Sequence, residues 1–595
     1  MEQKQQKGDY GFRQIKIKNR LPELLVIFFC MLLLGIGVSR KEGFHMDELL
    51  SFELSNAEFN PWIVPTQPEG RLAKFVNREI KADTFGEMVK NMADTVMDVL
   101  QNRGESKLLS YQADVYEEPV WITAEQFHDY ITVDEDAFNY LSVYFNVKDD
   151  NHPPFHFMLL HTVSSLFRGR AEAWMGCAIN MVCVAITMIL LMKLGRLIAP
   201  AFGWERYDRA LGLLAALSYG CSTGAMATVS LIRMYGLLTC FCVALLYLHV
   251  KKWLSEGFAS HNKGLIAVTV LGFLTQYFFL FYCLILAAVT AVLLWCRKRG
   301  RELLVYVRSM IIAGIIGVGI FPFAVADVFS SGRGVEALDN LASGLNGMWL
   351  RLQSFAGILA DRTFGGVLFV ILVVLAVMLC GLSVRRGDRT AVGSGQRTVS
   401  ALLFIPVIGY FLLAARMSPY LVDRYIMPLF PFVAFFGALV LVGVAVFLER
   451  NGKSSRFFYI ICGVILVLQL WGLVRYDGTY LYHGYGAQEQ LSEEYAEYPC
   501  ICVYDGVGYY ENLPEFTHYK ETLLVTEAEL ADRKETESIS SLEKVIVLIK
   551  PSVDRQKVFE TLEEKYGFNL LQELLSESSG QADGIYLFEG KALKQ

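Results

Sequence analysis

The chain alternates long apolar runs with short polar segments. The first run covers residues 21–38, and a clear second one covers residues 174–191 after a long polar stretch at 39–150. Runs of this length can cross roughly 30 Å of hydrocarbon as helices. Later runs lie at about 210–229, 233–250, 264–276, 278–295, 304–325, 365–384, 400–416, 425–448 and 456–475. The pattern predicts a polytopic α-helical membrane protein with about 11 spans.

Clusters of Lys and Arg between these runs predict the topology. Such clusters favour the cytoplasmic side, and residues 1–20 are also basic, so the first span reads as an uncleaved signal anchor in a plasma membrane. Keeping every cluster inside allows only one span between the 39–150 loop and Lys193. The helix after His152-Pro153-Pro154 should therefore be re-entrant or lie at the surface; if it spans, there are 12 spans and the downstream topology inverts.

Residues 476–595 have a different character. Strand-like segments at 501–504, 522–526, 544–549 and 585–588 alternate with helical patterns such as 553–566. This predicts a small extracytoplasmic α/β domain after a membrane domain at 21–475. It lacks a glycine-rich phosphate loop or a nucleophile constellation, so we expect an accessory, acceptor-binding or purely structural role.

Composition supports the membrane assignment. Hydrophobic residues make up 54% of the chain and charged residues 19%, with a formal net charge of −6, so nothing indicates nucleic-acid binding. The 12 cysteines lie mostly inside apolar runs, where they act as small buried hydrophobes, and none has zinc-ligand spacing.

Apolar residues recur at helical spacing within the 39–150 loop: Phe85, Met88, Val89, Met92, Val96 and Val99. This stripe fits a helix lying on the bilayer surface. It equally fits the core side of an ordinary helix in a loop domain.

Candidate chemistry begins directly after the first span, in Gly43-Phe44-His45-Met46-Asp47-Glu48. A charged cap on a membrane helix is the plain alternative. The predicted topology places other polar residues on the same outer side: Asp150, His152, Arg233, Tyr235, Arg424 and Tyr425. Outer-face arginines run against the usual charge bias and are costly unless something, such as a bound anion, holds them.

These residues suit a lipid-linked phosphate substrate, because the guanidinium donor fork matches phosphate geometry. Glycosyl transfer from a polyprenyl-phosphate sugar fits best. Its leaving group is already a phosphate anion, so the acidic carboxyl of a glycosidase is unnecessary. One general base, Asp47, would take the acceptor's proton as the new bond forms, and attack opposite the phosphate would invert the anomeric carbon.

Short motifs resemble the GT-C glycosyltransferase superfamily, specifically the family 39-like group of protein O-mannosyltransferases and the bacterial aminoarabinose transferase of lipid A. The motifs are Asp47-Glu48, Asp150-Asn151-His152-Pro153-Pro154-Phe155, Arg233-Met234-Tyr235 and Arg424-Tyr425 with Pro428. The resemblance implies that Asp47 is the base, that Glu48 and His152 line the sugar-phosphate pocket, and that Arg233 and Arg424 contact phosphate. Departures are Leu231-Ile232 before Arg233, Gln276 in the family's Thr-His-Tyr, and Phe155-His156 for Leu-Tyr.

Simpler readings exist for each residue. His152 would cap a helix, Arg233 would pair with Asp150, Arg424 would pair with its neighbour Asp423, and Tyr235, Tyr277 and Tyr425 would be interfacial anchors. Asp47, Glu48, Asp149 and Asp150 are possible oxygen ligands for a divalent cation. The resemblance implies no required metal or other cofactor.

Two other classes compete with an enzyme. A transporter or lipid flippase tends to show broken helices and polar groups near the midplane, whereas here the spans read as mostly continuous and the charges gather at one face. A scaffold protein would make the motifs coincidental. The expected partners are a polyprenyl-phosphate sugar and a glycan, lipid or protein acceptor.

Overall fold

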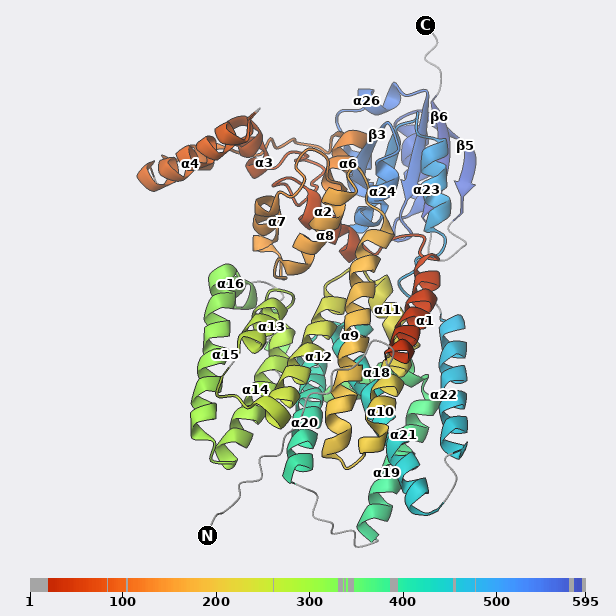
Figure 1. Ribbon diagram of the computed structural model, residues 1–595. Coiled ribbons are helices and arrows are strands. Elements are labelled where there is room, and N and C mark those ends of the chain that lie inside the picture. Colours follow the sequence, from red (N-terminus) through yellow and green to blue (C-terminus); the bar gives the residue numbers. More distant parts are fainter. Residues whose placement is uncertain are drawn as a thin grey trace, which may run out of the picture.

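The computed structural model describes residues 20–82, 84–102, 105–260, 262–329, 335–336, 339–340, 347–385, 394–452, 456–476, 478–576 and 583–590. The predicted basic N-terminus, residues 1–19, lies outside these ranges. The described chain forms two layers (Figure 1). Long helices build a bundle, and short helices with a β-sheet cover one end of it.

The bundle contains the predicted apolar runs as helices. They are α1 (Leu21–Val38), α9 (Ala173–Ala201), α10 (Asp208–Gly220), α11 (Thr223–Ser230), α12 (Tyr235–Lys251), α13 (Lys263–Phe273), α14 (Phe279–Cys296), α15 (Gly300–Ile320), α18 (Met348–Phe364), α19 (Val367–Arg385), α20 (Ser394–Met417), α21 (Phe430–Arg450, after the 3-10 turn Asp423–Leu429) and α22 (Arg456–Val474). Among the described residues, seven helices are long and apolar enough to cross a membrane, or up to nine if each of two bent pairs counts as one span. The predicted spans at 264–276 and 456–475 correspond to shorter apolar helices.

One predicted span, 210–229, is not continuous, and a second bend joins the predicted 326–363 loop to the predicted span at 365–384. The chain bends by 58° between α10 and α11, where the Ser222 hydroxyl accepts a hydrogen bond from the Ala225 amide and starts a new helix. It bends by 97° between α18 and α19, where Gly365 and Gly366 both have positive φ angles. Broken helices therefore do not separate this protein from a transporter.

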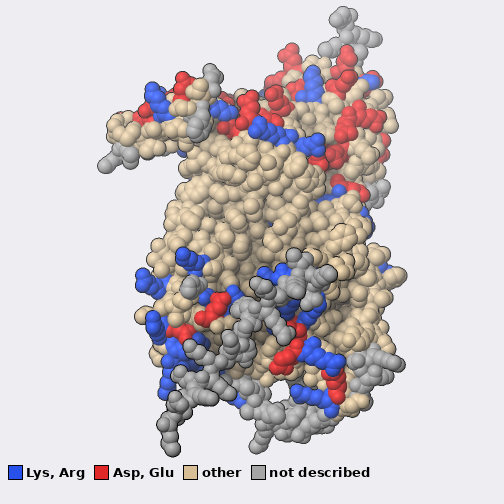
Figure 2. All heavy atoms as spheres, in the orientation of Figure 1, with Lys and Arg blue, Asp and Glu red and all other residues tan. Residues whose placement is uncertain are grey.

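Small residues pack two helices of the bundle closely, and one buried carboxylate ties three of its helices together at one end. A Cβ atom on Gly195 of α9 would lie 2.4 Å from the backbone nitrogen of Gly212 in α10, so only glycine permits this contact. At the opposite end from the sheet, Glu23 of α1 pairs with Arg196 and Arg209. On the face drawn in Figure 2, an uncharged band crosses the molecule and Lys and Arg gather below it, as expected for a membrane-spanning surface.

The covering layer is built largely from the 39–172 segment. Its helices are α2 (Met46–Asn56), α3 (Arg71–Phe75), α4 (Phe85–Asn102), α5 (Lys107–Ser110), α6 (Ala124–Ile131), α7 (Tyr140–Asn146) and α8 (Phe155–Leu166). The helix that follows His152-Pro153-Pro154 is α8, and it lies in this layer with α2 (Figure 1). Its first amide donates to the Leu274 carbonyl at the end of α13.

A six-stranded sheet has the order β1-β3-β2-β4-β6-β5. Its strands are β1 (Trp121–Thr123), β2 (Cys500–Tyr504), β3 (Glu521–Thr526), β4 (Lys544–Ile549), β5 (Phe568–Leu575) and β6 (Gly584–Gly590), and the main helices beside it are α23 (Tyr485–Glu494), α24 (Leu513–Phe516), α25 (Glu527–Asp532) and α27 (Arg555–Glu564). The central strands β3, β2 and β4 are parallel and apolar on both faces. Four strands match the predicted segments, whereas β5 and β1 were not predicted. Since β1 comes from the 39–150 loop, the sheet is not confined to residues 476–595.

The Gly195–Gly212 approach gives a stability prediction. Gly195→Ala should lower the free energy of unfolding by about 1–3 kcal/mol, because the new methyl group forces α9 and α10 apart. The matched control is Gly314→Ala in α15, whose Cβ would meet nothing within 4 Å. Thermal unfolding in detergent should show a lower Tm for Gly195→Ala only. Equal Tm values for both variants would contradict the packing described here.

Candidate active site

The N-terminus of α2 presents the two predicted carboxylates to different surroundings. His45 is the N-cap, its Nδ1 accepts a hydrogen bond from the Asp47 amide at 3.0 Å, and the Glu48 carboxylate accepts one from the His45 amide at 2.7 Å. This reciprocal capping box fixes the first turn of the helix. Asp47 and Glu48, adjacent in sequence, therefore point to different neighbours.

The Glu48 carboxylate is fully buried, and its hydrogen bonds bring three parts of the chain together. It accepts from Lys41 Nζ at 2.9 Å and from the Ile232 amide at 2.7 Å, in the turn between α11 and α12. Lys41 also donates to the Tyr480 carbonyl at 2.6 Å. Glu48 does not line the cavity described below, so this structure gives it a positioning role and not the pocket-lining role that the sequence resemblance implied.

The Asp47 carboxylate lies in the cavity and pairs with the guanidinium of Arg424, which comes from the turn before α21. Burial raises the pKa of Asp47, but the positive charges of Arg233 and Arg424 outweigh it and lower the pKa to about 2. Asp47 is therefore ionised throughout the physiological range. Arg424 keeps a buried Nε donor that has no hydrogen-bond partner among the described residues.

Arg233 joins the predicted His152 element to α2. Its guanidinium donates to the Asp47 carbonyl at 3.0 Å and to the Ser51 hydroxyl at 2.9 Å, and lies 3.4 Å from His152 Nδ1. His152 Nδ1 is 3.0 Å from an Asp150 carboxylate oxygen. The α8 N-cap is Pro154 with no side-chain cap, so the helix-capping reading of His152 is wrong. Burial raises the pKa of Asp150, but the His152 contact and the Arg233 charge lower it overall.

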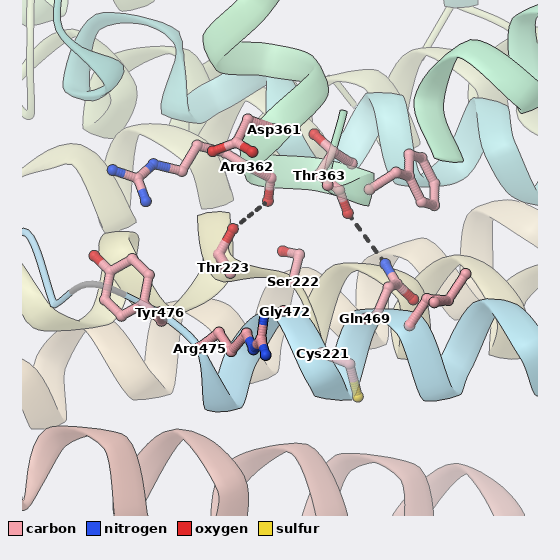
Figure 3. A pocket seen from close by; sticks show the side chains of 13 residues that line it. Cys221, Ser222, Thr223, Asp361, Arg362, Thr363, Gln469, Gly472, Arg475 and Tyr476 are labelled. Atoms are coloured by element: carbon pink, nitrogen blue, oxygen red, sulfur yellow. Dashed lines mark hydrogen bonds between the residues drawn. The ribbon is translucent and has the colours of Figure 1, made fainter. Parts of the chain in front are cut away.

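The residue before Arg424, Asp423, forms a separate ion pair. The Asp423 carboxylate accepts from the Tyr480 hydroxyl and pairs with Arg362 Nε at 3.1 Å. The local Asp423–Arg424 pair considered from the sequence is therefore wrong. Figure 3 shows Arg362 at a smaller cavity of about 200 Å³, where its carbonyl accepts from the Thr223 hydroxyl at 3.2 Å. Arg362 and Tyr480 were not identified from the sequence, because only the fold brings them to Asp423.

The main cavity has a volume of about 370 Å³ and two chemically different ends. The polar end contains Asp47, Asp150, His152, Arg233 and Arg424. The remaining wall is mainly aromatic and apolar, and includes Met46, Leu50, Leu54, Trp62, Phe278, Leu280, Phe281 and Met417.

The tyrosines named in the sequence analysis also face this cavity. Tyr235 and Tyr425 are buried in its wall with their rings 6.4 Å apart, so they are not interfacial anchors. Tyr277 donates to an Asp327 carboxylate oxygen at 2.6 Å, and both residues line the cavity. Asp327 was not identified from the sequence. The cavity thus gathers every predicted site residue except Glu48.

Possible metal ligands gather elsewhere. Among the described residues, His128, Asp129 and Asp134 bring three ligand atoms within 4.8 Å of one another, outside the main cavity and partly exposed. The Asp149 side chain lies outside the described part of the structure. Both Glu48 oxygens already accept hydrogen bonds from Lys41. Arg233 and Arg424 supply the positive charge at the polar end of the cavity.

No protein-family model and no curated protein matches the chain. Among solved structures, it is similar to ArnT from Cupriavidus metallidurans bound to undecaprenyl phosphate, with 12% identity over 96% of this chain and 99% of that one and a TM-score of 0.48. It is also similar to an oligosaccharyltransferase from Archaeoglobus fulgidus in complex with zinc and sulfate, with 12% identity over 67% and 59% and a TM-score of 0.35. Both are GT-C glycosyltransferases. At such identities, function has to be inferred from this chain's own site.

The Glu48 contacts give a second stability prediction. Glu48→Ala should destabilise the protein by about 3–5 kcal/mol, because it leaves the buried Lys41 ammonium without its anion. Glu494→Ala, at an exposed position in α23, should change stability by less than about 0.5 kcal/mol. Chemical or thermal unfolding of the purified protein measures both. A Glu48→Ala protein as stable as Glu494→Ala would refute the positioning role.

Proposed function

We propose that the protein is an inverting glycosyltransferase that moves a sugar from a polyprenyl-phosphate donor to an acceptor hydroxyl or amine at the outer face of the membrane. The observation that carries this proposal is the composition of the main cavity. It combines a partly buried, ionised carboxylate, Asp47, with two guanidinium groups at one end. Its other walls are mainly aromatic and apolar, with Asn151, Gln276 and Asp327 as the polar exceptions, and include the first turn of the apolar helix α14. An anionic headgroup on a lipid chain matches this division.

The donor phosphate would bind to Arg424 and Arg233. Arg424 has an unused buried Nε donor, and a guanidinium binds phosphate through several parallel hydrogen bonds. His152, held by Asp150, would complete the phosphate contacts. The polyprenyl chain would leave along Phe278 and Phe281 into the bilayer.

Asp47 would act as the general base. The acceptor oxygen or nitrogen attacks the anomeric carbon as the bond from that carbon to the phosphate oxygen breaks, and the bonding electrons remain on the polyprenyl phosphate. The acceptor proton moves to the Asp47 carboxylate. A carboxylate with a low pKa cannot remove this proton in advance, so the transfer is late and concerted with sugar–acceptor bond formation.

Donor binding would also raise the pKa of Asp47, the proposed base. In this structure Arg424 is paired with Asp47, and its positive charge helps to hold the Asp47 pKa down. A phosphate dianion or diester that binds Arg424 offsets that charge. The Asp47 pKa then rises, and the carboxylate becomes a stronger base only when the donor is in place. The arginines supply the charge stabilisation, so the proposed reaction requires no metal ion.

Loss of the base should remove transfer. In detergent or nanodiscs, Asp47→Asn should reduce sugar transfer from a radiolabelled polyprenyl-phosphate donor to membrane-extract acceptors by about 10²–10⁴-fold. The control is Asp505→Asn, at an exposed position in the sheet domain, which should transfer as the wild type does. A panel of mannose, other hexose and amino-sugar donors identifies the sugar. Repeating each assay with EDTA tests whether the reaction needs a metal ion.

Full activity in a folded Asp47→Asn protein would disprove the role of this residue as base. Movement of an intact donor across liposomes, with no transfer by the wild type, would instead favour the transporter or flippase reading. Activity that EDTA abolishes and added divalent cation restores would contradict the metal-free reaction.

The proposal also fixes which side of the plasma membrane each part faces. The active site and the sheet domain should be outside, and the N-terminus and the end of α14 inside. In intact cells, a membrane-impermeant maleimide should label the introduced cysteine of an Asp505→Cys protein but not the exposed native Cys296, the last residue of α14. Permeabilised cells should label both. Labelling of Cys296 in intact cells would invert the topology.

A further inference from the structure

Helix α4 leaves the covering layer as an arm (Figure 1). Its root is packed, because Met88 and Met92 join a small cluster with Phe75, Val76 and Ile80. Val89 and Val96 are 47% and 58% exposed and lie on one side of the helix, two turns apart. Two exposed apolar side chains aligned on one helix indicate a contact surface and not a core position.

The charged residues of α4 lie on a different side of the helix from its exposed valines. Glu87, Lys90 and Asp94 are exposed, and they lie on the opposite side of the helical wheel from Val89 and Val96. Figure 2 shows charged side chains along the upper edge of this arm, away from the uncharged band of the bundle. The arm lies near the level where that band ends (Figure 2).

We infer that α4 is an interfacial helix that rests on the outer leaflet, with Val89 and Val96 in the lipid and its charged side in water. The occupant of the apolar face is thus the bilayer surface. The four charged residues of α4 are Glu87, Lys90, Asp94 and Asp98, which give it a net negative charge. The helix therefore binds through burial of apolar side chains, and its insertion does not depend on anionic lipids.

This contact would set the height of the catalytic helix above the membrane. The cluster at the root of α4 includes Phe59, three residues after the end of α2. Lipid contact along α4 would thus support α2 and Asp47 at the depth of the donor phosphate. That consequence rests on the proposed function, whereas the lipid contact itself does not.

Two single-cysteine labels on the same helix test the inference. Val96→Cys and Asp94→Cys proteins, with the native Cys296 replaced by serine, carry an environment-sensitive fluorophore in nanodiscs of neutral phosphatidylcholine. The Val96 label should be quenched several-fold more strongly by nitroxide-bearing lipid than by aqueous iodide. The Asp94 label, on the polar side, should show the reverse order. Adding anionic lipid should leave both ratios unchanged.

Equal access of iodide to both positions would overturn the inference, because the arm would then stand in water. A Val96 label shielded from both quenchers would also overturn it, since a second copy of the chain or a protein partner would then cover the face. Dependence on anionic lipid would refute insertion by apolar burial alone. Lipid quenching at Val96 in a protein that transfers no sugar would support this inference and remove only the proposed function.

Discussion

The candidate site depends on one buried carboxylate, that of Glu48. A buried charge is costly unless its hydrogen bonds are complete, and those of Glu48 come from Lys41, from the start of α2 and from the turn between α11 and α12. Lys41 in turn binds the Tyr480 carbonyl, beyond the last apolar helix. The segment after the first span can therefore dock only when both the bundle and the C-terminal segment are in place.

The cost of burying an unpaired charge also explains why the two members of each adjacent charged pair have different partners. Glu48 is neutralised by Lys41, whereas Asp47 faces the cavity and Arg424. Asp423 is held by Arg362 and Tyr480, whereas Arg424 turns the other way. In each pair, one residue forms an ion pair outside the cavity and its neighbour faces the cavity. This division explains how a site with a strongly charged interior is kept rigid without using up its reactive groups.

The covering layer acts as one structural unit. The 39–150 loop contributes strand β1 to the C-terminal sheet, and the hydroxyls of Tyr509 and Tyr510 donate to the Ile63 carbonyl. Gly43 allows the Tyr485 side chain to approach, because a Cβ atom there would lie 2.6 Å from the Cβ of Tyr485. The sheet domain is thereby fixed over the loop that contains Asp47, which suits a role in presenting an acceptor to the outer mouth of the cavity.

The sequence alone determined the membrane class, most of the apolar helices, four of the six strands and the residues at the polar end of the cavity. These features follow from local properties of the sequence, because the length of each apolar run and the distribution of Lys and Arg between runs can be read along the chain. The sequence missed β5, since Phe568–Leu575 follows a helical pattern and only Gly567, with φ of +76°, separates them. It also read 210–229 as one span, because apolar composition does not report a break at Ser222.

Only the tertiary structure determines which group each charged side chain pairs with. From the sequence, Asp47 was the candidate base and Glu48 a candidate pocket residue, and a pair with Asp423 was the simpler reading of Arg424. The choice depends on groups far away in the chain, such as Lys41 with Tyr480 and Arg362 with Asp423. Burial makes each unpaired charge expensive, so the fold settles all of these pairings together. No local pattern in the sequence carries that information.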